Sequence, residues 1–358
     1  MNKEKINSLF LLLVDNLVWV FVIISLIVFS LISENFFTPF NLVNILSRVA
    51  PLALLVIGQS FPLITANFDL SSESTMGFTA MVAALLLASQ VNGGFGVELN
   101  PFLGMLIMLL VGVLIGALNG VFITRLGMNN FIMTVAMLMI LRGATYAISP
   151  GKSVNFLPEE FNWLGGGSLF RIPLENGKFV AVPVAMFFVI LAFLVAHIIT
   201  KYTRFGRDMY AVGSNRQAAE AAGIDSKRVI LLVYMVSGLC AALAGLLDAG
   251  RMDSATPRTG AGLIFPVQAA AVIGGISLFG GRGNLIGAFG GVLLWGILDT
   301  GLNIARVSPF WIEVSRGALL LFAMFIDALK VRYLHRVALK KVLATSTVGL
   351  KDPLHQVD

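Results

Sequence analysis

Residues 205–229 read FGRDMYAVGSNRQAAEAAGIDSKRV, a compact charged segment between two long apolar stretches. The basic residues that lie in it or just before it are Lys201, Arg204, Arg207, Arg216, Lys227 and Arg228. The chain on either side is too apolar to be soluble. A membrane protein with so much charge in one short segment is expected to hold that segment out to a partner.

The composition sets the class of the protein. Hydrophobic residues make up 57% of the chain and charged residues only 12%, against about 25% charged residues in a soluble domain. The apolar runs between charges are roughly 18–25 residues long, enough for a helix to cross a bilayer. A single cysteine, Cys240, excludes an internal disulfide. We therefore predict an all-α polytopic membrane protein.

Ten spans are predicted from the apolar runs. They cover about 15–33, 41–66, 73–91, 101–124, 128–149, 182–200, 228–250, 263–280, 284–303 and 310–330. The first belongs to an N-terminal part, 1–40, that lacks a cleavage site and is expected to be retained. The transmembrane domain is 41–331, with halves at about 41–149 and 228–331 and a charged segment at 201–228. A tail follows at 332–358.

Loop charge predicts the orientation. Lys3 and Lys5 place the N-terminus in the cytoplasm, and ten crossings place the 201–228 segment and the basic tail on the same side. The net charge of +6 is thus a topology and lipid signal, and no nucleic acid partner is expected. The 150–181 segment falls outside, where a solvated connection is expected, although a loop this long often meets a partner.

Two short sequence motifs that recur in the same order predict an inverted repeat. LIGA occurs at Leu114–Ala117 and Leu285–Ala288, and RGA follows each at Arg142–Ala144 and Arg316–Ala318. The first LIGA lies in a span running inward and the second in a span running outward. This is the relation found in many transporters, with chance similarity as the alternative.

The sequence shows no motif for bond chemistry. Residues 151–153 read GKS, but Tyr146 stands where the first glycine of a phosphate-binding loop belongs. No H-E-x-x-H and no Cys/His cluster occurs, so neither a catalytic residue nor a metal site is predicted and a membrane-embedded enzyme is disfavoured. A gradient-driven carrier remains the rival class, weakly supported because few carboxylates lie in mid-span.

Two polar, helix-breaking stretches interrupt the spans. The first, Thr65–Thr75, contains Asn67, Asp69, Ser71, Ser72 and Glu73. Asp69 and Glu73 share a face if the segment is helical, and Ser71 with Ser74 offers cap chemistry. The second, Gly274–Gly283, contains Gly274, Gly275 and Ser277. The first stretch is either a polar turn at the cytoplasmic surface or a helix broken inside the membrane, and paired breaks predict a substrate path.

The charged segment has the signals of a short helix. Ser214 is a candidate cap with Gln217 three positions on, Gln217–Ala222 favours helix, and Gly223 suits a helix stop. Gly206 and Gly213 are expected to allow sharp entry turns. Composition leaves open whether this helix only lies on lipid.

These residues carry a family resemblance. The pattern G-R-x-x-Y-A-V-G-S-N-x-x-A-A-x-x-A-G-I-x-x-x-R-V over Gly206–Val229 resembles the cytoplasmic coupling segment of sugar-type permeases of ABC importers, within the broader branched-chain amino acid and sugar permease group. Gly274–Gly283, Asn129–Thr134 (NNFIMT) and Val307–Trp311 are similar to that family too. The residues assigned to ATPase coupling by this resemblance are Gly206, Arg207, Tyr210, Gly213, Ser214, Asn215, Ala218, Ala219, Ala222, Gly223, Ile224 and Arg228.

The resemblance implies a type II importer fold in the bacterial inner membrane, with two permease subunits as a homodimer or pseudo-dimer. Each coupling helix would dock on a separate ATPase subunit that holds ATP and Mg²⁺, so no cofactor is expected in this chain. A periplasmic or extracellular binding protein would deliver a monosaccharide or related polyol. Nucleosides, amino acids and autoinducer-type ligands are the alternatives within the family.

One departure concerns the first polar break. The family reads close to G-I-D-L-S-V-G there, whereas this chain reads Asn67-Phe-Asp-Leu-Ser-Ser-Glu73. Asp69 and Ser71 are kept, while Asn67, Ser72 and Glu73 replace small or apolar residues. The substrate-path residues predicted here are Asn67, Asp69, Ser71, Ser72, Glu73, Asn129, Asn130, Gly274, Gly275 and Ser277. The added carboxylate puts a simple analogy with ribose in doubt.

Overall fold

The computed structural model describes residues 17–173, 179–325 and 328–329. Its elements are α2 (Leu17–Ile32), α3 (Pro39–Ile64), α4 (Ser72–Leu87), η1 (Gln90–Asn92), α5 (Pro101–Arg125), α6 (Asn130–Ile148), β1 (Val154–Asn155), α7 (Glu159–Gly166), β2 (Ser168–Pro173), β3 (Phe179–Pro183), α8 (Val184–Tyr202), α9 (Arg204–Ser214), α10 (Arg216–Ala221), α11 (Ser226–Met252), β4 (Ser254–Ala255), α12 (Ile264–Ile273) and α13 (Leu285–Ile304). Residues 309–325 are also helical.

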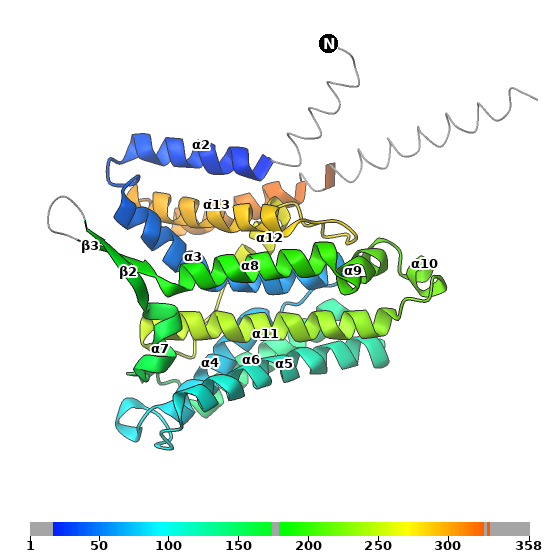
Figure 1. Ribbon diagram of the computed structural model, residues 1–358, viewed down its shortest axis with the longest axis horizontal. Coiled ribbons are helices and arrows are strands. Elements are labelled where there is room, and N and C mark those ends of the chain that lie inside the picture. The colour runs from blue at the N-terminus through cyan, green and yellow to red at the C-terminus, as the bar shows by residue number, and fades with distance from the viewer. Residues whose placement is uncertain (1–16, 174–178, 326–327, 330–358) are drawn as a thin grey trace, which may run out of the picture.

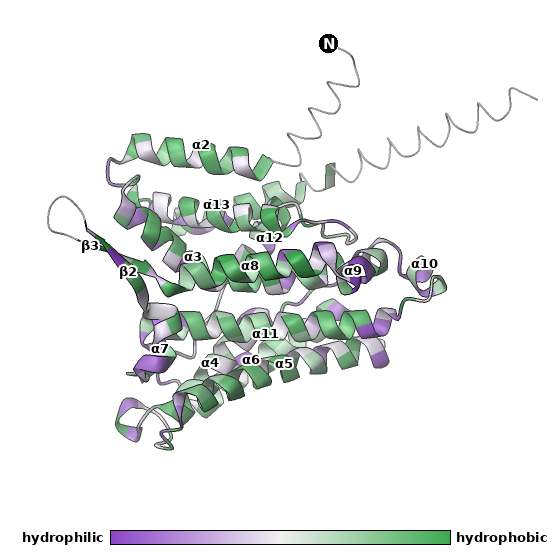
Figure 2. Cartoon of the chain, in the orientation of Figure 1, coloured by the Kyte–Doolittle hydropathy of each residue, from purple (hydrophilic) through white to green (hydrophobic). Residues whose placement is uncertain are grey.

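The long helices run side by side and give the molecule two ends (Figure 1). The β2–β3 hairpin and α7 lie at one end, called here the hairpin end, and α9 and α10 lie at the other, called the α10 end. Figure 2 shows apolar residues along the helices and hydrophilic ones concentrated at α9, α10, α7 and β2. This is the distribution expected of a bundle that crosses a membrane.

Six helices in the described part of the chain are long and apolar enough to cross a membrane. They are α3, α5, α6, α8, α11 and α13. Three predicted spans appear as shorter apolar helices: α2, α4 and α12. The span predicted at 73–91 is α4, which ends at Leu87 and gives way to the η1 turn. The span predicted at 263–280 contains the ten-residue α12 followed by a loop.

Local sequence sets the helix starts. The Asn100 side chain accepts hydrogen bonds from the backbone N–H groups of Phe102 and Leu103, and proline follows at the first helical position of α5. Asn284 caps α13 in the same way, accepting from Ile286 N–H at 3.0 Å. These caps satisfy backbone donors that the helices leave free.

Helix α11 lies at the centre of the packing, against α3, α4, α5 and α7. Glycines make its contact with α5 close: a β-carbon on Gly116 would lie 2.1 Å from the carbonyl oxygen of Tyr234, and one on Gly112 would lie 2.5 Å from that of Gly238. The opposite face of α5 carries exposed leucines such as Leu106 and Leu110. Membrane helices pack through small residues in this way and leave large apolar side chains to the lipid.

The 150–181 segment is more ordered than a solvated connection. Its helix α7 packs on α11, where a β-carbon on Gly165 would lie 2.2 Å from the carbonyl oxygen of Leu247. Phe161 of α7 is fully buried. Strand β1 pairs antiparallel with β4, and β2 pairs antiparallel with β3. The prediction of a purely solvated loop is therefore wrong in part, because one face of this segment covers the hairpin end while β2 stays exposed.

Several predictions fall on residues outside the described part of the chain. They concern Lys3 and Lys5, the start of the first span, the end of the last one and the tail at 332–358.

Candidate functional site

Helices α9 and α10 form a small unit at the α10 end (Figure 1). The Thr203 hydroxyl caps α9 by accepting from Gly206 N–H at 3.1 Å. Asn215 separates the helices with extended dihedral angles, and its side chain caps α10 by accepting from Ala218 N–H at 3.0 Å. The predicted Ser214 cap is thus wrong by one position, because Ser214 completes the last turn of α9.

The stop signal of α10 is confirmed. Gly223 has φ +85, and its N–H donates to Glu220 O while Ile224 N–H donates to Ala219 O. This left-handed glycine ends the helix as predicted. Asp225 then caps α11 by accepting from Arg228 N–H, so only four residues separate the two helices.

Helix α10 has an exposed outer surface and one buried alanine that anchors the helix to the core. Ala219 is 4% exposed and belongs to the main core, whereas Ala218 and Ala222 face outward. The other exposed residues among those assigned to coupling are Arg207, Ser214, Asn215, Gly223 and Arg228. Arg216 reaches Glu220 at 3.1 Å and Ser226 at 3.1 Å. The hydrogen bond from Ser226, followed by that from Arg216, lowers the pKa of Glu220.

Helix α9 is seated tightly on the bundle. Gly206 and Gly213 lie within it, so the predicted entry turns are wrong. Their function is close approach: a β-carbon on Gly213 would lie 1.8 Å from Ile64 O, and one on Gly206 would lie 2.1 Å from Thr200 O. The Tyr210 hydroxyl donates to Gly283 O at 2.8 Å, and burial raises the pKa of this phenol.

The first polar break leaves the helical path after Ile64. Ala66 adopts φ +57, and residues 67–69 have no regular structure before α4 begins at Ser72. Asp69 accepts from Ser71 N–H at 3.0 Å, from Ser71 O–H at 2.6 Å and from Ser237 O–H at 2.6 Å. The Asp69 side chain is therefore not on a helical face shared with Glu73, and Ser71 uses its hydroxyl for Asp69 rather than for a helix cap.

This break is inside the protein rather than a surface turn. Asp69, Ser71 and Ser72 are at most 2% exposed and Glu73 is 7% exposed. Asn119 of α5 donates to the Ser71 hydroxyl at 2.8 Å, and Tyr234 of α11 donates to Phe68 O at 2.7 Å. Helices α3, α4, α5 and α11 are thereby tied together at one buried polar centre.

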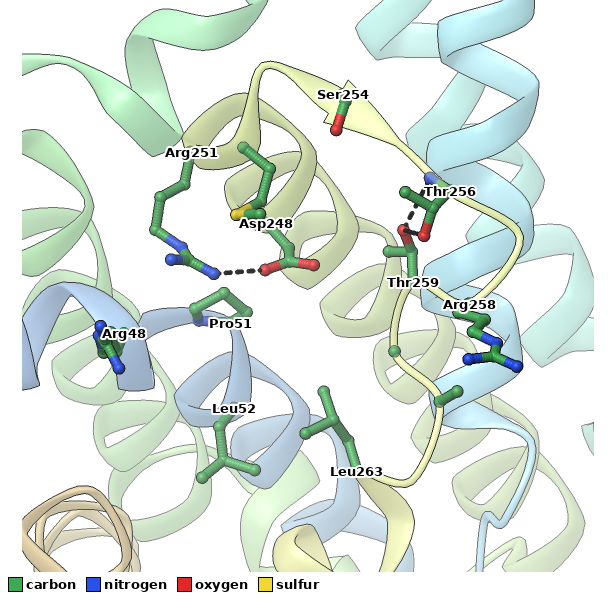
Figure 3. A pocket seen from close by; sticks show the side chains of 13 residues that line it. Arg48, Pro51, Leu52, Asp248, Arg251, Ser254, Thr256, Arg258, Thr259 and Leu263 are labelled. Carbon is green, nitrogen blue, oxygen red and sulfur yellow. Dashed lines mark hydrogen bonds and ion pairs between the residues drawn. The ribbon is translucent and has the colours of Figure 1, made fainter. Parts of the chain in front are cut away.

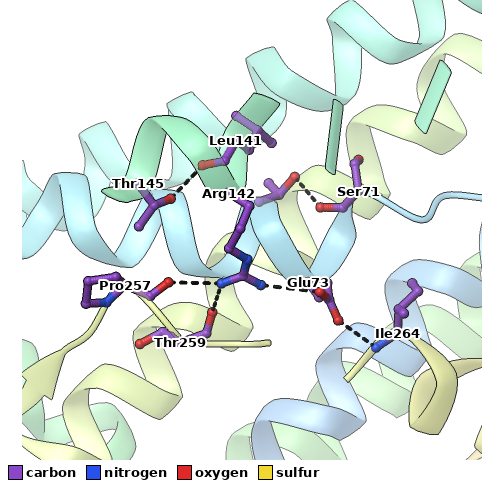
Figure 4. A network of polar contacts seen from close by, with 9 residues as sticks. Ser71, Glu73, Leu141, Arg142, Thr145, Pro257, Thr259 and Ile264 are labelled. Atoms are coloured by element: carbon purple, nitrogen blue, oxygen red, sulfur yellow. Dashed lines mark hydrogen bonds and ion pairs between the residues drawn. The ribbon is translucent and has the colours of Figure 1, made fainter. Parts of the chain in front are cut away.

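Glu73 has a partner that sequence reasoning missed. Arg142 of α6 reaches it at 3.3 Å and also donates to the carbonyl oxygens of Pro257 and Thr259, at 3.1 and 3.0 Å (Figure 4). The second carboxylate oxygen of Glu73 accepts from Ile264 N–H at 3.0 Å. Arg142 appeared in the sequence only as part of the RGA echo. The available signal was its position inside an apolar span, where an ionisable residue needs a partner.

The second break is brought against the end of α3. Gly281 N–H donates to Ile64 O at 2.8 Å, the same carbonyl that Gly213 of α9 approaches. Gly275, Gly280 and Gly281 adopt positive φ angles, which glycine allows without strain. Gly274 lies against Gly287 and Ala288 of α13. Ser277 is 5% exposed and accepts from Phe279 N–H.

The substrate-path residues predicted from sequence do not all meet at one point. Asn67 and Asn130 are joined at 2.9 Å and line a cavity of about 540 Å³ at the α10 end, together with Arg216 and Lys227. Asn129 caps α6 and is exposed. Asp69 and Glu73 lie in the two buried networks above. Among the described residues, no group of three or more His, Cys, Asp or Glu side chains could hold a metal.

Comparison with known proteins identifies the family. The model of the branched-chain amino acid transport system permease component matches residues 41–324. The chain belongs to this permease family.

Curated relatives confirm the resemblance to sugar-type permeases. The ribose import permease RbsC of Escherichia coli K12 is 33% identical over 316 residues, which cover 87% of this chain and 92% of RbsC. The D-allose transport system permease AlsC of the same strain is 33% identical over 312 residues, or 87% and 90% of the two chains. The galactose/methyl galactoside permease MglC of Haemophilus influenzae is 30% identical over 340 residues, or 92% and 98%. No solved structure matches the chain.

Family membership and the six apolar helices indicate a multi-pass protein of the inner membrane. The relatives are permease components of transport systems rather than enzymes.

Proposed function

We propose that this chain is the membrane-spanning subunit of an ATP-driven importer that carries a monosaccharide or related polyol. The proposal rests on the family match and on the relatives, which are named for ribose, allose and galactose. A separate ATPase hydrolyses ATP, an external binding protein delivers the sugar, and a second permease subunit completes the pathway.

The observation that carries the coupling role is the α9–α10 unit. Helix α10 presents exposed alanines at one end of the bundle while Ala219 and the glycines of α9 fix it to the core. A helix held this rigidly transmits a push from a partner, since packed interiors do not deform continuously. A helix that only rests on lipid needs an apolar outer face, and α10 instead exposes Arg216, Gln217 and Glu220.

The topology completes the proposal: ten spans, with both termini and α10 in the cytoplasm. The packing supports an inverted repeat. The first helix of each half lies against the next two helices of the other half: α3 lies against α12 and α13, and α11 lies against α4 and α5. Both LIGA glycines allow a close helix contact: Gly116 lets α5 approach α11 of the other half, and Gly287 lets α13 approach the end of α12 in its own half.

Reconstitution tests the proposal. The chain should co-purify with its ATPase, and proteoliposomes that hold both, together with the binding protein, should accumulate sugar only with ATP. Uptake by the purified permease alone, driven by an ion gradient, would refute the importer reading and support a carrier. A thermal-shift panel of sugars, polyols and nucleosides on the binding protein would identify the cargo.

A further inference from the structure

A cavity of about 350 Å³, drawn in Figure 3, opens at the hairpin end, where α11 ends and far from α10 (Figure 1). Its wall combines α3, the last turn of α11 and the loop between β4 and α12. Its volume lies near the lower end of the range of about 300–1,000 Å³ for ligand pockets, which suits a single sugar unit. The residues that line it are Arg48, Pro51, Leu52, Asp248, Arg251, Met252, Ser254, Thr256, Arg258, Thr259, Gly260, Ala261 and Leu263.

The cavity is strongly cationic. It contains three arginines and one aspartate, and Asp248 is already paired with Arg251 at 3.0 Å. No ion pair in the described part of the chain involves Arg48 or Arg258. In Figure 3 these two lie on opposite sides of the Asp248–Arg251 pair. Two positive charges are therefore available to a ligand.

The position of Arg48 indicates water on this side of α3. It stands nine residues after the helix start at Pro39, which is about 14 Å along the axis, and it is exposed. A charged side chain facing lipid at such depth is costly, so intramembrane arginines face a cavity or a partner. Arg48 is thus placed for a solute rather than for the bilayer.

The loop that carries Arg258 is held in place from behind. Arg142 binds the carbonyl oxygens of Pro257 and Thr259, and Glu73 binds Ile264 N–H. A β-carbon on Gly77 of α4 would lie 2.5 Å from Thr259 O. The backbone on both sides of Arg258 is therefore fixed, and the loop presents Arg258, Ser254 and Thr256 to one cavity.

We propose that this cavity is an entry subsite for a carbohydrate that carries a negative charge, either a sugar acid or a sugar phosphate. Either Arg48 or Arg258, which lie on opposite sides of the cavity, binds the anionic group, and the hydroxyls of Ser254 and Thr256 bind those of the sugar. This inference rests on the proposed importer function and narrows its substrate class. Guanidinium groups suit both carboxylate and phosphate, so experiment decides between them.

The test uses the full-length chain in nanodiscs of neutral lipid and equilibrium dialysis with radiolabelled glucose, glucuronate and glucose 6-phosphate. At low salt at least one anion should bind roughly tenfold or more tighter than glucose, the factor expected of one charge-assisted contact. Added salt should reduce this preference. The better-bound anion identifies the anionic group.

Variants assign the effect to the cavity. The double variant Arg48→Gln with Arg258→Gln should lose the preference for the anion, and Arg171→Gln should keep it. Arg171 is a matched control because it is exposed on β2 at the same end and does not line the cavity. Size-exclusion chromatography checks that each variant is folded.

The inference would be overturned by equal binding of all three sugars, by no binding of either anion at millimolar concentration, or by a preference that survives in the double variant. If the double variant weakens only docking of the binding protein, the arginines serve that contact and the inference fails. ATP-driven uptake of glucose with no uptake of either anion would refute the inference and leave the importer function standing. A folded chain that prefers anions but never couples to an ATPase would refute the importer function and leave the anion-binding cavity standing.

Discussion

Removing Arg142 is expected to damage the protein more than removing Glu73, although the two residues form one ion pair. The Glu73 side chain is 9% exposed and the Arg142 side chain is 18% exposed. In Arg142→Leu the carboxylate stays buried without its cation, and the carbonyl oxygens of Pro257 and Thr259 lose their donor. Breaking a buried pair in this way costs about 3–5 kcal/mol.

Glu73→Gln should cost less, about 1–2 kcal/mol. The glutamine oxygen still accepts from Ile264 N–H, and Arg142 keeps both carbonyl acceptors. In the double variant no unpaired charge remains, so its loss should be smaller than the sum of the two single losses. A coupling of about 1–2 kcal/mol is expected between contacting charged groups.

The assay is the apparent melting temperature of the purified chain in one detergent, followed by tryptophan fluorescence in all four proteins. Arg142→Leu should melt lowest, Glu73→Gln should lie near the parent, and the double variant should melt at or above Arg142→Leu. Equal losses in the single variants, or additive losses in the double variant, would refute the claim that Glu73 is a buried charge held by Arg142.

Three further predictions concern the α10 end. Ala218→Arg should abolish co-purification with the ATPase and leave the melting temperature unchanged, whereas Ala219→Arg should lower it because that side chain is buried. Gly213→Val should force α9 away from the bundle, since its β-carbon has no room, and should uncouple ATP hydrolysis from uptake. The Ser226 hydroxyl lowers the pKa of Glu220 from 4.5, so this contact stabilises the segment above pH 4.5 and is lost as the pH falls through the lowered pKa. Glu220→Gln should remove this acid dependence from amide exchange in α10.

The sequence was informative where local chemistry decides the structure. Long apolar runs predicted the membrane helices, and Gly223 predicted the end of α10, because length and a left-handed glycine are local properties. The cap of α10 was misplaced because Ser214 and Asn215 are both good caps, and tertiary contacts of Ser214 with Gly281 decide between them.

The contacts that organise the site are distant in sequence. The partner of Glu73 is 69 residues away, and the Ser237 hydroxyl that binds Asp69 is 168 residues away. No periodicity or spacing predicts such pairs. Gly213 of α9 shows the same limit, because a glycine in a turn and a glycine at a close approach look alike in sequence, and its neighbour Ile64 lies far along the chain.

The same contacts explain how the two ends of the molecule are linked. The Ile64 carbonyl oxygen meets Gly281 N–H and lies against Gly213 of α9, so a displacement of α9 must shift the end of α3 and the second break with it. Five residues beyond the end of α3, the polar centre around Asp69 ties this region to α5 and α11.

Next along the chain, Glu73 in the first turn of α4 pairs with Arg142 of α6, and together they hold the loop that bears Arg258. Each step is a short polar contact or a packed backbone. We therefore expect a partner that displaces α9 to shift the cavity at the opposite end through this chain of contacts. Arg142→Leu breaks this path midway, and it should uncouple ATP hydrolysis from uptake even where the protein remains folded.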